Sequence, residues 1–308
     1  MIDTVCLVGC NYGANVILES IKRLGSKIKI LGISGFKDRG NHYLDYPYYN
    51  NWKNMIIELK PKFVVLAVPP YVQSEIIIYL MKHNIDFLCE KPITHDIESL
   101  KKIKKYNLST KSKILVDLNF LTIPAIQKMR EIITNNNDKF EYFELKWYVN
   151  PTTSLQKSWK NDIVLGGGFL NNFFFHILSI LNFWFNGKYK ITLKNYDSNL
   201  FEFRCYYNKI CFSIKFIINK YNNLFEFKAN SKKHKYILRN KSLDYHNNFR
   251  IYKNGKVIFK KNFNRNHARV FATYEILRYY FENRKNKYID LNSSINIQQI
   301  IFSFYNDK

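Results

Sequence analysis

The sequence is short of cysteine, of acidic residues and of uninterrupted apolar runs, and each shortage excludes a class of protein. Its five cysteines are odd in number and show no metal-ligand spacing. This favours reduced thiols over a disulfide framework, and no metal is expected. The most apolar stretch, residues 169–185, is interrupted by Asn171, Asn172, His176 and Asn182. Since polar groups are costly within a bilayer, we expect no membrane span.

The first residues carry no export signal. The apolar run from Val5 to Val8 lacks a basic leader and is shorter than the apolar core of a signal peptide. Together with the reduced cysteines, this predicts a soluble, cytoplasmic protein.

Only 24 acidic residues accompany 48 lysines and arginines, which gives a formal net charge of +24. Such a balance suits nucleic acid, an anionic membrane surface or an acidic small substrate. The lysines are spread through most of the chain, and we interpret runs such as residues 101–105 and 232–235 as solvated faces of helices and strands. A nucleic-acid partner is therefore not expected.

Residues 63–92 carry the strongest signal for function. Phe63 to Val68 is a short, β-branched apolar run, typical of a parallel strand covered on both faces. The pair Pro69-Pro70 ends it, a helix follows, and a second strand leads to Glu90-Lys91-Pro92. Ligands of open parallel sheets bind at the carboxyl edge of the strands. Lys91, held there between a strand and a proline, is the best catalytic candidate.

A dinucleotide-binding turn is predicted at residues 9–14. The strand from Thr4 to Val8 precedes Gly9-Cys10-Asn11-Tyr12-Gly13-Ala14 and a helix, in the layout G-x-G-x-x-G/A with Asn11 at the second glycine position. An asparagine side chain takes up room where that glycine lets the backbone approach a pyrophosphate. Cofactor contacts are expected from Gly9, Asn11, Tyr12, Gly13 and Ala14. The alternative is an ordinary strand–helix turn.

The second strand, Lys29 to Ile33, ends without the acidic residue that usually holds the ribose 2′-hydroxyl of NAD. Ser34 stands there instead, with Lys37 and Arg39 a few residues on. Cations suit a 2′-phosphate, so the sequence favours NADP over NAD as the cofactor. The alternative is that Lys37 and Arg39 are solvated loop charges.

The pattern changes near residue 120, where we place a boundary between domains of residues 1–120 and 121–308. The first part alternates strands and helices, as in an α/β domain with a parallel sheet. The second part alternates apolar and polar residues between polar turns, which is typical of an antiparallel sheet. The predicted strands are 140–148, 201–207, 210–218, 225–229, 236–239, 249–252 and 257–259.

A glycine run lies between the boundary and that sheet. Gly166-Gly167-Gly168 leads into an apolar helix that carries Asn172 and His176. The run offers exposed backbone N–H groups for a ligand, and a spacing of four places Asn172 and His176 on one α-helical face. A lone histidine on an apolar helix is more often a core residue. With the glycine run beside it, we favour a role in the site.

In their order and spacing, these motifs resemble the glucose–fructose oxidoreductase / inositol dehydrogenase / rhizopine catabolism (Gfo/Idh/MocA) family. The matching elements are the turn at 9–14, Ala67-Val68-Pro69-Pro70, Cys89-Glu90-Lys91-Pro92 and the glycine run with Asn172 and His176. The resemblance implies an α/β protein with an N-terminal Rossmann domain and a C-terminal α+β domain with a large, mostly antiparallel open sheet. It also implies an NAD(P)-dependent oxidoreductase of sugars, cyclitols or nucleotide sugars, paired through that sheet as a homodimer or homotetramer.

Three departures from the family pattern bear on catalysis. Asn172 stands where the family usually has aspartate, Gln73 where a histidine commonly follows the proline pair, and Leu121 and Thr122 where an arginine often lies. Asparagine cannot accept a proton as a carboxylate does. Proton transfer then falls to His176, because an unperturbed pKa of about 6.5 suits that role.

The resemblance implies a site in which Lys91 hydrogen bonds the reacting oxygen, His176 moves the proton and Asn172 completes the catalytic set. The basic composition favours an anionic substrate such as a nucleotide sugar. Cofactor contacts are expected beyond the turn at 9–14 as well, from Ser34, Lys37, Arg39, Ala67, Pro69, Pro70, Glu90 and Lys91.

Two other functions stay open. The departures at Asn11, Gln73, Leu121 and Asn172 favour a family member that binds a dinucleotide or sugar without turning it over. A nucleic-acid binder depends on net charge alone and ranks last.

Overall fold

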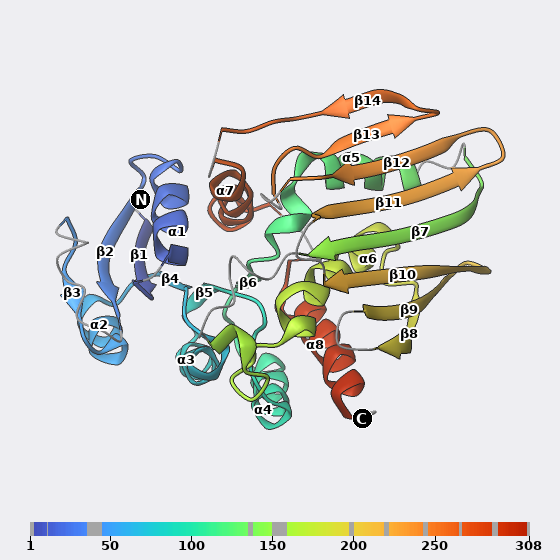
Figure 1. Ribbon diagram of the computed structural model, residues 1–308. Coiled ribbons are helices and arrows are strands. Elements are labelled where there is room, and N and C mark those ends of the chain that lie inside the picture. The colour runs from blue at the N-terminus through green and yellow to red at the C-terminus, as the bar shows by residue number, and fades with distance from the viewer. Residues whose placement is uncertain are drawn as a thin grey trace. The chain divides into compact units, whose positions relative to one another are not determined.

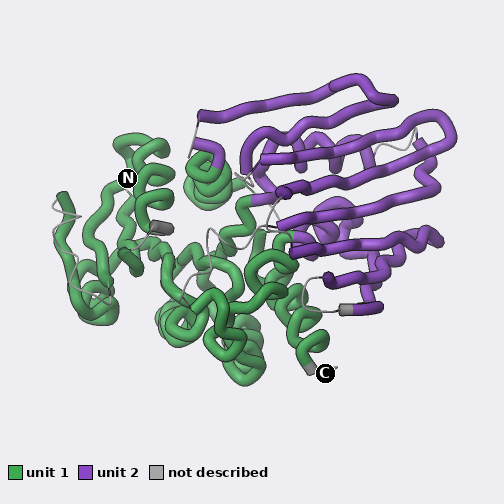
Figure 2. Tube along the Cα trace, in the orientation of Figure 1, with its two compact units in different colours: residues 1–119, 159–176, 269–308 green, residues 120–158, 177–268 purple. Residues whose placement is uncertain are grey.

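The computed structural model describes residues 3–10, 12–35, 45–134, 138–149, 159–196, 200–218, 222–242, 246–264, 267–284 and 289–306. The chain divides into two compact units, drawn in green and purple in Figure 2. The first comprises residues 1–119, 159–176 and 269–308, and the second comprises residues 120–158 and 177–268. The predicted division at residue 120 stays a prediction, because a compact unit need not coincide with a folding domain.

The first unit contains a six-stranded parallel sheet with strand order β3-β2-β1-β4-β5-β6. This is the order of a dinucleotide-binding Rossmann sheet, in which the chain reverses its direction of travel between β1 and β4. The strands are β1 (Asp3–Val8), β2 (Ile28–Ser34), β3 (Tyr48–Tyr49), β4 (Phe63–Leu66), β5 (Asp86–Cys89) and β6 (Ile114–Val116). The sequence pattern misses β3, because two residues give no periodicity.

Burial explains why the central strands are apolar throughout. Every residue of β4, and every residue of β1 from Val5 onward, has an exposed fraction of 0%. Strands covered on both faces need apolar side chains on both faces, so alternation disappears.

Helices cover both faces of this sheet. They are α1 (Tyr12–Lys22), α2 (Trp52–Leu59), α3 (Pro70–Lys82), α4 (Ile97–Asn107), most of α7 (His267–Phe281), and α8 (Leu291–Asn306). Right-handed crossovers place α1 on one face and α2, α3 and α4 on the other (Figure 1). α7 lies beside α1, where the hydroxyl of Ser20 donates to the carbonyl of Val270 at 3.0 Å. Pro70 is the first residue of α3, a position where the missing N–H is no loss.

The second unit contains an eight-stranded sheet of order β14-β13-β12-β11-β7-β10-β9-β8. Neighbouring strands are antiparallel except β10 and β7, which are parallel. The predicted fold class, a Rossmann sheet followed by a mostly antiparallel sheet, is confirmed. The strands are β7 (Phe140–Val149), β8 (Lys190–Tyr196), β9 (Leu200–Tyr207), β10 (Ile210–Ile218), β11 (Leu224–Ser231), β12 (Lys235–Asn240), β13 (Arg250–Lys253) and β14 (Lys256–Lys260).

One face of this sheet is an aromatic core and the other carries charges. α5 (Pro124–Thr134) and α6 (Phe175–Trp184) lie along the core face (Figure 1). The Trp184 indole packs on Phe227 at 4.4 Å between ring centroids and donates its N–H to the carbonyl of Ile126 at 3.0 Å. On the other face, the ammonium of Lys228 lies 2.6 Å from the carboxylate of Glu144. This alternation is the pattern that predicted the sheet.

Candidate active site

The dinucleotide turn lies where β1 ends and α1 begins. Gly9 has φ +127, and a Cβ added there would lie 2.3 Å from the carbonyl oxygen of Ala67. The N–H of Gly9 donates to the carbonyl of Ser34 at 2.7 Å. Only glycine fits such a close approach of backbones. The residues that follow β1, β2 and β4 therefore meet at one edge, next to the N-terminus of α1, which suits an anionic pyrophosphate.

The structure describes only some of the predicted cofactor residues. Ala14 is fully buried in α1, and the side chain of Ser34 has an exposed fraction of 2%. α1 begins at Tyr12. Asn11, Lys37 and Arg39 lie outside the described residues. The preference for NADP therefore stays a prediction.

Gln73 holds the Glu90-Lys91-Pro92 turn in place. Its side chain is fully buried in α3, its amide oxygen accepts from the N–H of Glu90 at 3.0 Å, and its amide nitrogen donates to the carbonyls of Glu90 at 2.7 Å and Pro92 at 3.1 Å. Glutamine offers an acceptor and a donor on one flat group, so a single side chain fixes both sides of the turn. Sequence analysis treated Gln73 only as a departure and missed this role.

Lys91 points into the glycine-run segment of the same unit. Its ammonium donates to the carbonyl oxygen of Asn172 at 2.5 Å, and the carbonyl of Asn171 lies 3.5 Å away. The pKa of Lys91 is lowered to about 7. Burial is the largest cause, and Lys160 and Arg269 act in the same direction, while Glu90 and Asp117 oppose the shift. Near neutral pH, Lys91 is therefore divided between ammonium and free amine, so it can both donate and accept a proton.

The segment that meets Lys91 is a π-helix, Leu170–Phe174, which continues into α6. The N–H of Phe175 donates to the carbonyl of Leu170, five residues back. Such wider turns are frequent at functional sites. The α-helical spacing that we assumed for Asn172 and His176 does not hold across this segment. His176, one turn after Asn172, is buried with an exposed fraction of 9%.

The side chain of Asn172 bonds to the backbone. Its amide nitrogen donates to the carbonyl of Lys160 at 2.6 Å, and that carbonyl also accepts from the N–H of Gly168 at 2.8 Å. Asn172 therefore fastens the turn that carries Lys160 to the start of the π-helix.

The glycine run does not offer free N–H groups to a ligand, so that prediction was wrong. The N–H groups of Gly166, Gly167 and Gly168 donate to the carbonyls of Ile163, Asp162 and Lys160 at 3.0, 2.7 and 2.8 Å. The glycines are needed for packing, since a Cβ at Gly166 would lie 2.7 Å from Pro70, and one at Gly167 would lie 2.2 Å from the carbonyl oxygen of Trp159.

Charged groups from three other segments surround Lys91, and sequence analysis missed all of them. Lys160 comes from the glycine-run segment, Arg269 from α7, and Asp117 directly follows β6. The guanidinium of Arg269 lies 3.6 Å from the carboxylate of Glu90. The position of Asp117 after a parallel strand was the one available signal, because the carboxyl ends of strands gather at the ligand edge.

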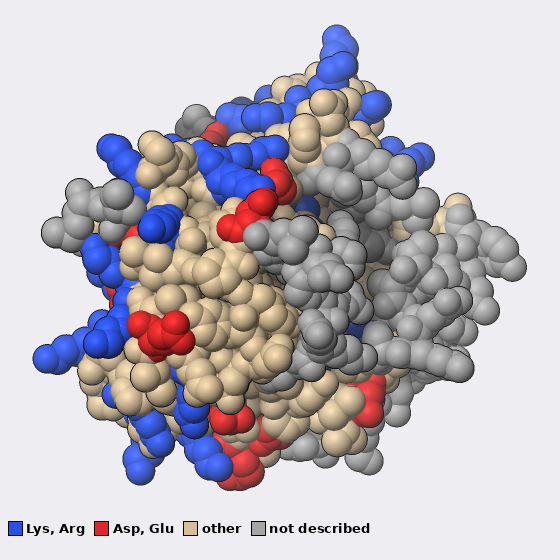
Figure 3. Space-filling model, turned by 90° about the vertical axis from the view of Figure 1, so that its left-hand side faces the viewer, with Lys and Arg blue, Asp and Glu red and all other residues tan. Residues whose placement is uncertain are grey.

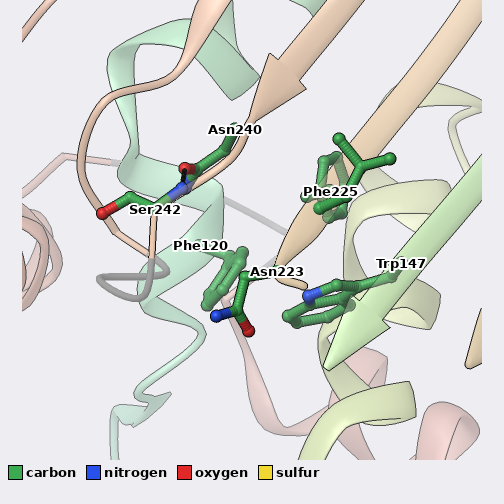
Figure 4. Close-up of a pocket in the computed structure, with 7 residues that line it drawn as sticks. Phe120, Trp147, Asn223, Phe225, Asn240 and Ser242 are labelled. Atoms are coloured by element: carbon green, nitrogen blue, oxygen red, sulfur yellow. Dashed lines mark hydrogen bonds between the residues drawn. The ribbon is translucent and has the colours of Figure 1, made fainter. Parts of the chain in front are cut away.

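A separate small pocket lies in the second unit, around Phe120, Trp147 and Phe225, with Asn223, Asn240 and Ser242 beside them (Figure 4). The three aromatic side chains are almost completely buried. None of the residues predicted for the site lines this pocket, and we assign it no function.

Three further observations concern metal binding, membrane-spanning helices and surface charge. Within the described ranges, no group of three or more histidine, cysteine or acidic residues is placed to hold a metal. No described helix combines the length and apolarity needed to cross a bilayer. On the face in Figure 3, Lys and Arg side chains are spread out, with neutral surface and acidic side chains between them.

The strand order and the close turn at Gly9 are those of a Rossmann fold, and Lys91 lies at the carboxyl edge of its sheet. Residues 4–118 match the model of the oxidoreductase family with an NAD-binding Rossmann fold, Gfo/Idh/MocA. The resemblance found in the motifs is thereby confirmed. No curated protein matches the sequence.

Solved structures share the fold over nearly the whole chain. An oxidoreductase of Thermotoga maritima matches with a TM-score of 0.80 at 16% identity, covering 98% of this chain and 95% of that one. Levoglucosan dehydrogenase in complex with NADH matches with a TM-score of 0.80 at 11% identity, covering 99% and 96%. A super-repressor mutant of Gal80p from Saccharomyces cerevisiae matches with a TM-score of 0.83 at 13% identity, covering 99% and 96%. At these identities the likeness shows the fold.

Proposed function

We propose that the protein transfers hydride between a nicotinamide cofactor and a secondary alcohol or ketone of a sugar or nucleotide sugar. One observation carries this proposal. The ammonium of Lys91 donates a hydrogen bond to the carbonyl of Asn172, which lies one turn before His176. The amine of Lys91 and the imidazole of His176 are thus carried by adjoining segments at the carboxyl edge of the sheet.

The residues at this edge fit a dinucleotide. The turn at Gly9 leaves a space that a Cβ would fill, and the N-terminus of α1 follows this turn. Backbone from Ala67 to Pro70, with Glu90 and Lys91 across from it, would line the nicotinamide side. The cofactor, when bound, supplies or accepts the hydride. We infer NADP over NAD, because Ser34 ends β2 where an acidic residue would favour NAD.

Each polar side chain then has a distinct task. Lys91 binds the reacting oxygen and stabilises the charge that develops on it. His176 shuttles the hydroxyl proton between the substrate and the amine of Lys91. Asn172 positions Lys160 through its carbonyl, and Glu90, paired with Arg269, orients the turn that carries Lys91.

An anionic substrate suits this charge distribution. Lys160 and Arg269 both lie close enough to lower the pKa of Lys91. Cations from separate segments that converge on one position favour a carboxylate or phosphate on the ligand. Nucleotide sugars and sugar acids are the substrate classes we place first.

The direct test incubates the purified protein with NADP or NAD and with matched neutral sugars, sugar acids and nucleotide sugars. We expect reduced nicotinamide to form with an acidic substrate, and binding titrations to favour NADPH over NADH. No turnover with any member of the panel, together with tight dinucleotide or sugar binding, would support the second function, a ligand-binding protein. The side chain of Asn172, which bonds to backbone, and the similar fold of Gal80p favour that alternative.

We also propose that the charged face of the eight-stranded sheet pairs two copies. Its acids and bases alternate, with Glu226 between Lys228 at 3.2 Å and Arg239 at 2.6 Å. A face with both signs can complement its own copy across a two-fold axis. Light scattering should give a homodimer or homotetramer mass that falls in high salt, whereas a monomer at all concentrations would contradict the pairing.

A further inference from the structure

Asp117 lies beside Glu90 at the carboxyl edge of the parallel sheet. Cys89 is paired with Val116 in the register of β5 and β6, so Glu90 and Asp117 leave neighbouring strands at the same level. The N–H of Asp117 donates to the carbonyl of Cys89 at 2.8 Å, which continues the ladder by one bond. Two carboxyl groups are thus brought together next to Lys91.

Few hydrogen bonds compensate for the burial of the Asp117 carboxyl. Its side chain has an exposed fraction of 2%, and one oxygen, Oδ2, accepts from the hydroxyl of Thr273 at 3.2 Å. The other, Oδ1, is buried and has no hydrogen-bond partner among the described residues. A buried, incompletely paired carboxylate is costly, so the proton-bound form is favoured.

The groups that act on this carboxyl come from three segments. The end of β5 contributes Cys89, Glu90 and Lys91, and α7 contributes Arg269 and the neutral Thr273; Asn119 follows on its own segment. Burial, and then the charge of Glu90, raise the pKa of Asp117 to about 7, while Arg269, Thr273 and Asn119 oppose this shift. Arg269 already lies 3.6 Å from Glu90.

We propose that Asp117 is a positioning residue that exchanges charge with Lys91: when the amine of Lys91 takes up a proton, the carboxyl of Asp117 gives one up. The pair is then either neutral amine with neutral acid, or ammonium with carboxylate. The summed charge of the pair is zero in both states, so proton exchange creates no additional net charge away from water.

In the direction of alcohol oxidation, the proton of the substrate hydroxyl ends on the amine of Lys91, and Asp117 releases its own proton to water. The hydride and its two electrons leave with the cofactor, so the substrate loses one hydride and one proton. In the direction of ketone reduction, Lys91 gives its proton to the alkoxide and Asp117 is protonated from water. This deepens the proposed function and rests on it for the role of Lys91.

The test needs no substrate. In the full-length protein with 13C-labelled aspartate carboxyls, one resonance should titrate near pH 7, and Asp117→Asn should remove it. Lys91→Met takes away a positive neighbour, so the same resonance should titrate about one pH unit higher. Thr273→Val, which removes the hydroxyl donor and keeps the volume, should also raise it. Glu98→Gln, which neutralises an exposed carboxylate on α4, should leave it unchanged.

Two results would overturn the proposal: an Asp117 carboxyl that titrates below pH 5, or one that does not move in Lys91→Met. If Asp117→Asn does not fold, the shift in Thr273→Val identifies the resonance instead. A protein without dehydrogenase activity whose Asp117 still responds to Lys91→Met would refute the proposed function and leave the charge exchange intact. Where turnover is found, Asp117→Asn should shift the alkaline limb of its pH profile to lower pH.

Discussion

Replacing Lys91 with methionine should stop turnover and at the same time stabilise the fold. Methionine keeps the length of the side chain and removes an ammonium whose pKa burial lowers from 10.5 to about 7. At about 1.4 kcal/mol per pH unit, the charged form is disfavoured by about 4–5 kcal/mol. The unfolded chain keeps the ordinary lysine pKa and therefore binds more protons than the native protein between pH 7 and 10.5. The stability of the wild type consequently rises with pH across this window.

The expected gain follows from that difference. It is about 4 kcal/mol at pH 7 and about 2 kcal/mol at pH 9, from which the lost bond to the carbonyl of Asn172 subtracts about 1 kcal/mol. Urea unfolding followed by tryptophan fluorescence at pH 6.5 to 9 measures it. Lys101→Met is the control, because Lys101 is an exposed partner of Glu98, with 66% of its side chain accessible. It should change stability by less than about 0.5 kcal/mol at every pH. A Lys91→Met protein less stable than the wild type at pH 7, or a gain that does not vary with pH, would refute the reasoning.

Three further substitutions test the dinucleotide turn, the turn that carries Lys91, and a hydrogen-bonded group in the second unit. Gly9→Ala should weaken dinucleotide binding at least about tenfold in a calorimetric titration, since its Cβ would strike backbone 2.3 Å away. Gly25→Ala has the same sign of φ but open space around its Cβ, so it should cost only about 1 kcal/mol of stability and leave affinity intact. Gln73→Ala should lower the unfolding free energy by about 2–3 kcal/mol and turnover with it, because buried groups of the Glu90 turn lose their partners; normal turnover would contradict this role. Asp138→Asn should cost about 1 kcal/mol at neutral pH, since the carboxylate accepts from Tyr236 and contacts His234. The hydrogen bonds lower the pKa of Asp138, so this loss should be full above pH about 4 and vanish at lower pH; a loss independent of pH would contradict it.

Much of the fold follows from local patterns. β4 could be predicted because a buried parallel strand is apolar at every position, and the eight-stranded sheet because one face of it is dry and the other charged. β8 was missed, although its pairing with β9 is regular from Lys190 to Leu193. Its sequence alternates polar with apolar residues too briefly to separate a strand from a loop. The parallel pairing of β10 with β7 was also missed, since strand direction depends on how the chain crosses the sheet.

The candidate site was predictable in its chemistry and less so in its geometry. Lys91 could be placed at the ligand edge because Glu90-Lys91-Pro92 directly follows the end of a strand, β5. The π-helix could not be predicted from the sequence, since its wider turns depend on tertiary contacts such as the hydrogen bond from Gln298 to Asn171 at 3.1 Å. β6 ends at Val116, one residue before Asp117. One residue of difference at a strand end decides whether a carboxyl belongs to the sheet or to the site.

Whether the protein turns its ligand over depends on what the departures from the family pattern do. Gln73 and Asn172 both have structural tasks, one holding the turn before Lys91 and the other holding the turn at Lys160. Neither has to carry a proton if Lys91 itself titrates near neutral pH. A protein that only bound its ligand would be more stable with an uncharged residue at position 91, because the desolvated ammonium opposes folding. A group that costs stability and exchanges protons is expected where chemistry takes place, so the environment of Lys91 favours an enzyme over a binding protein.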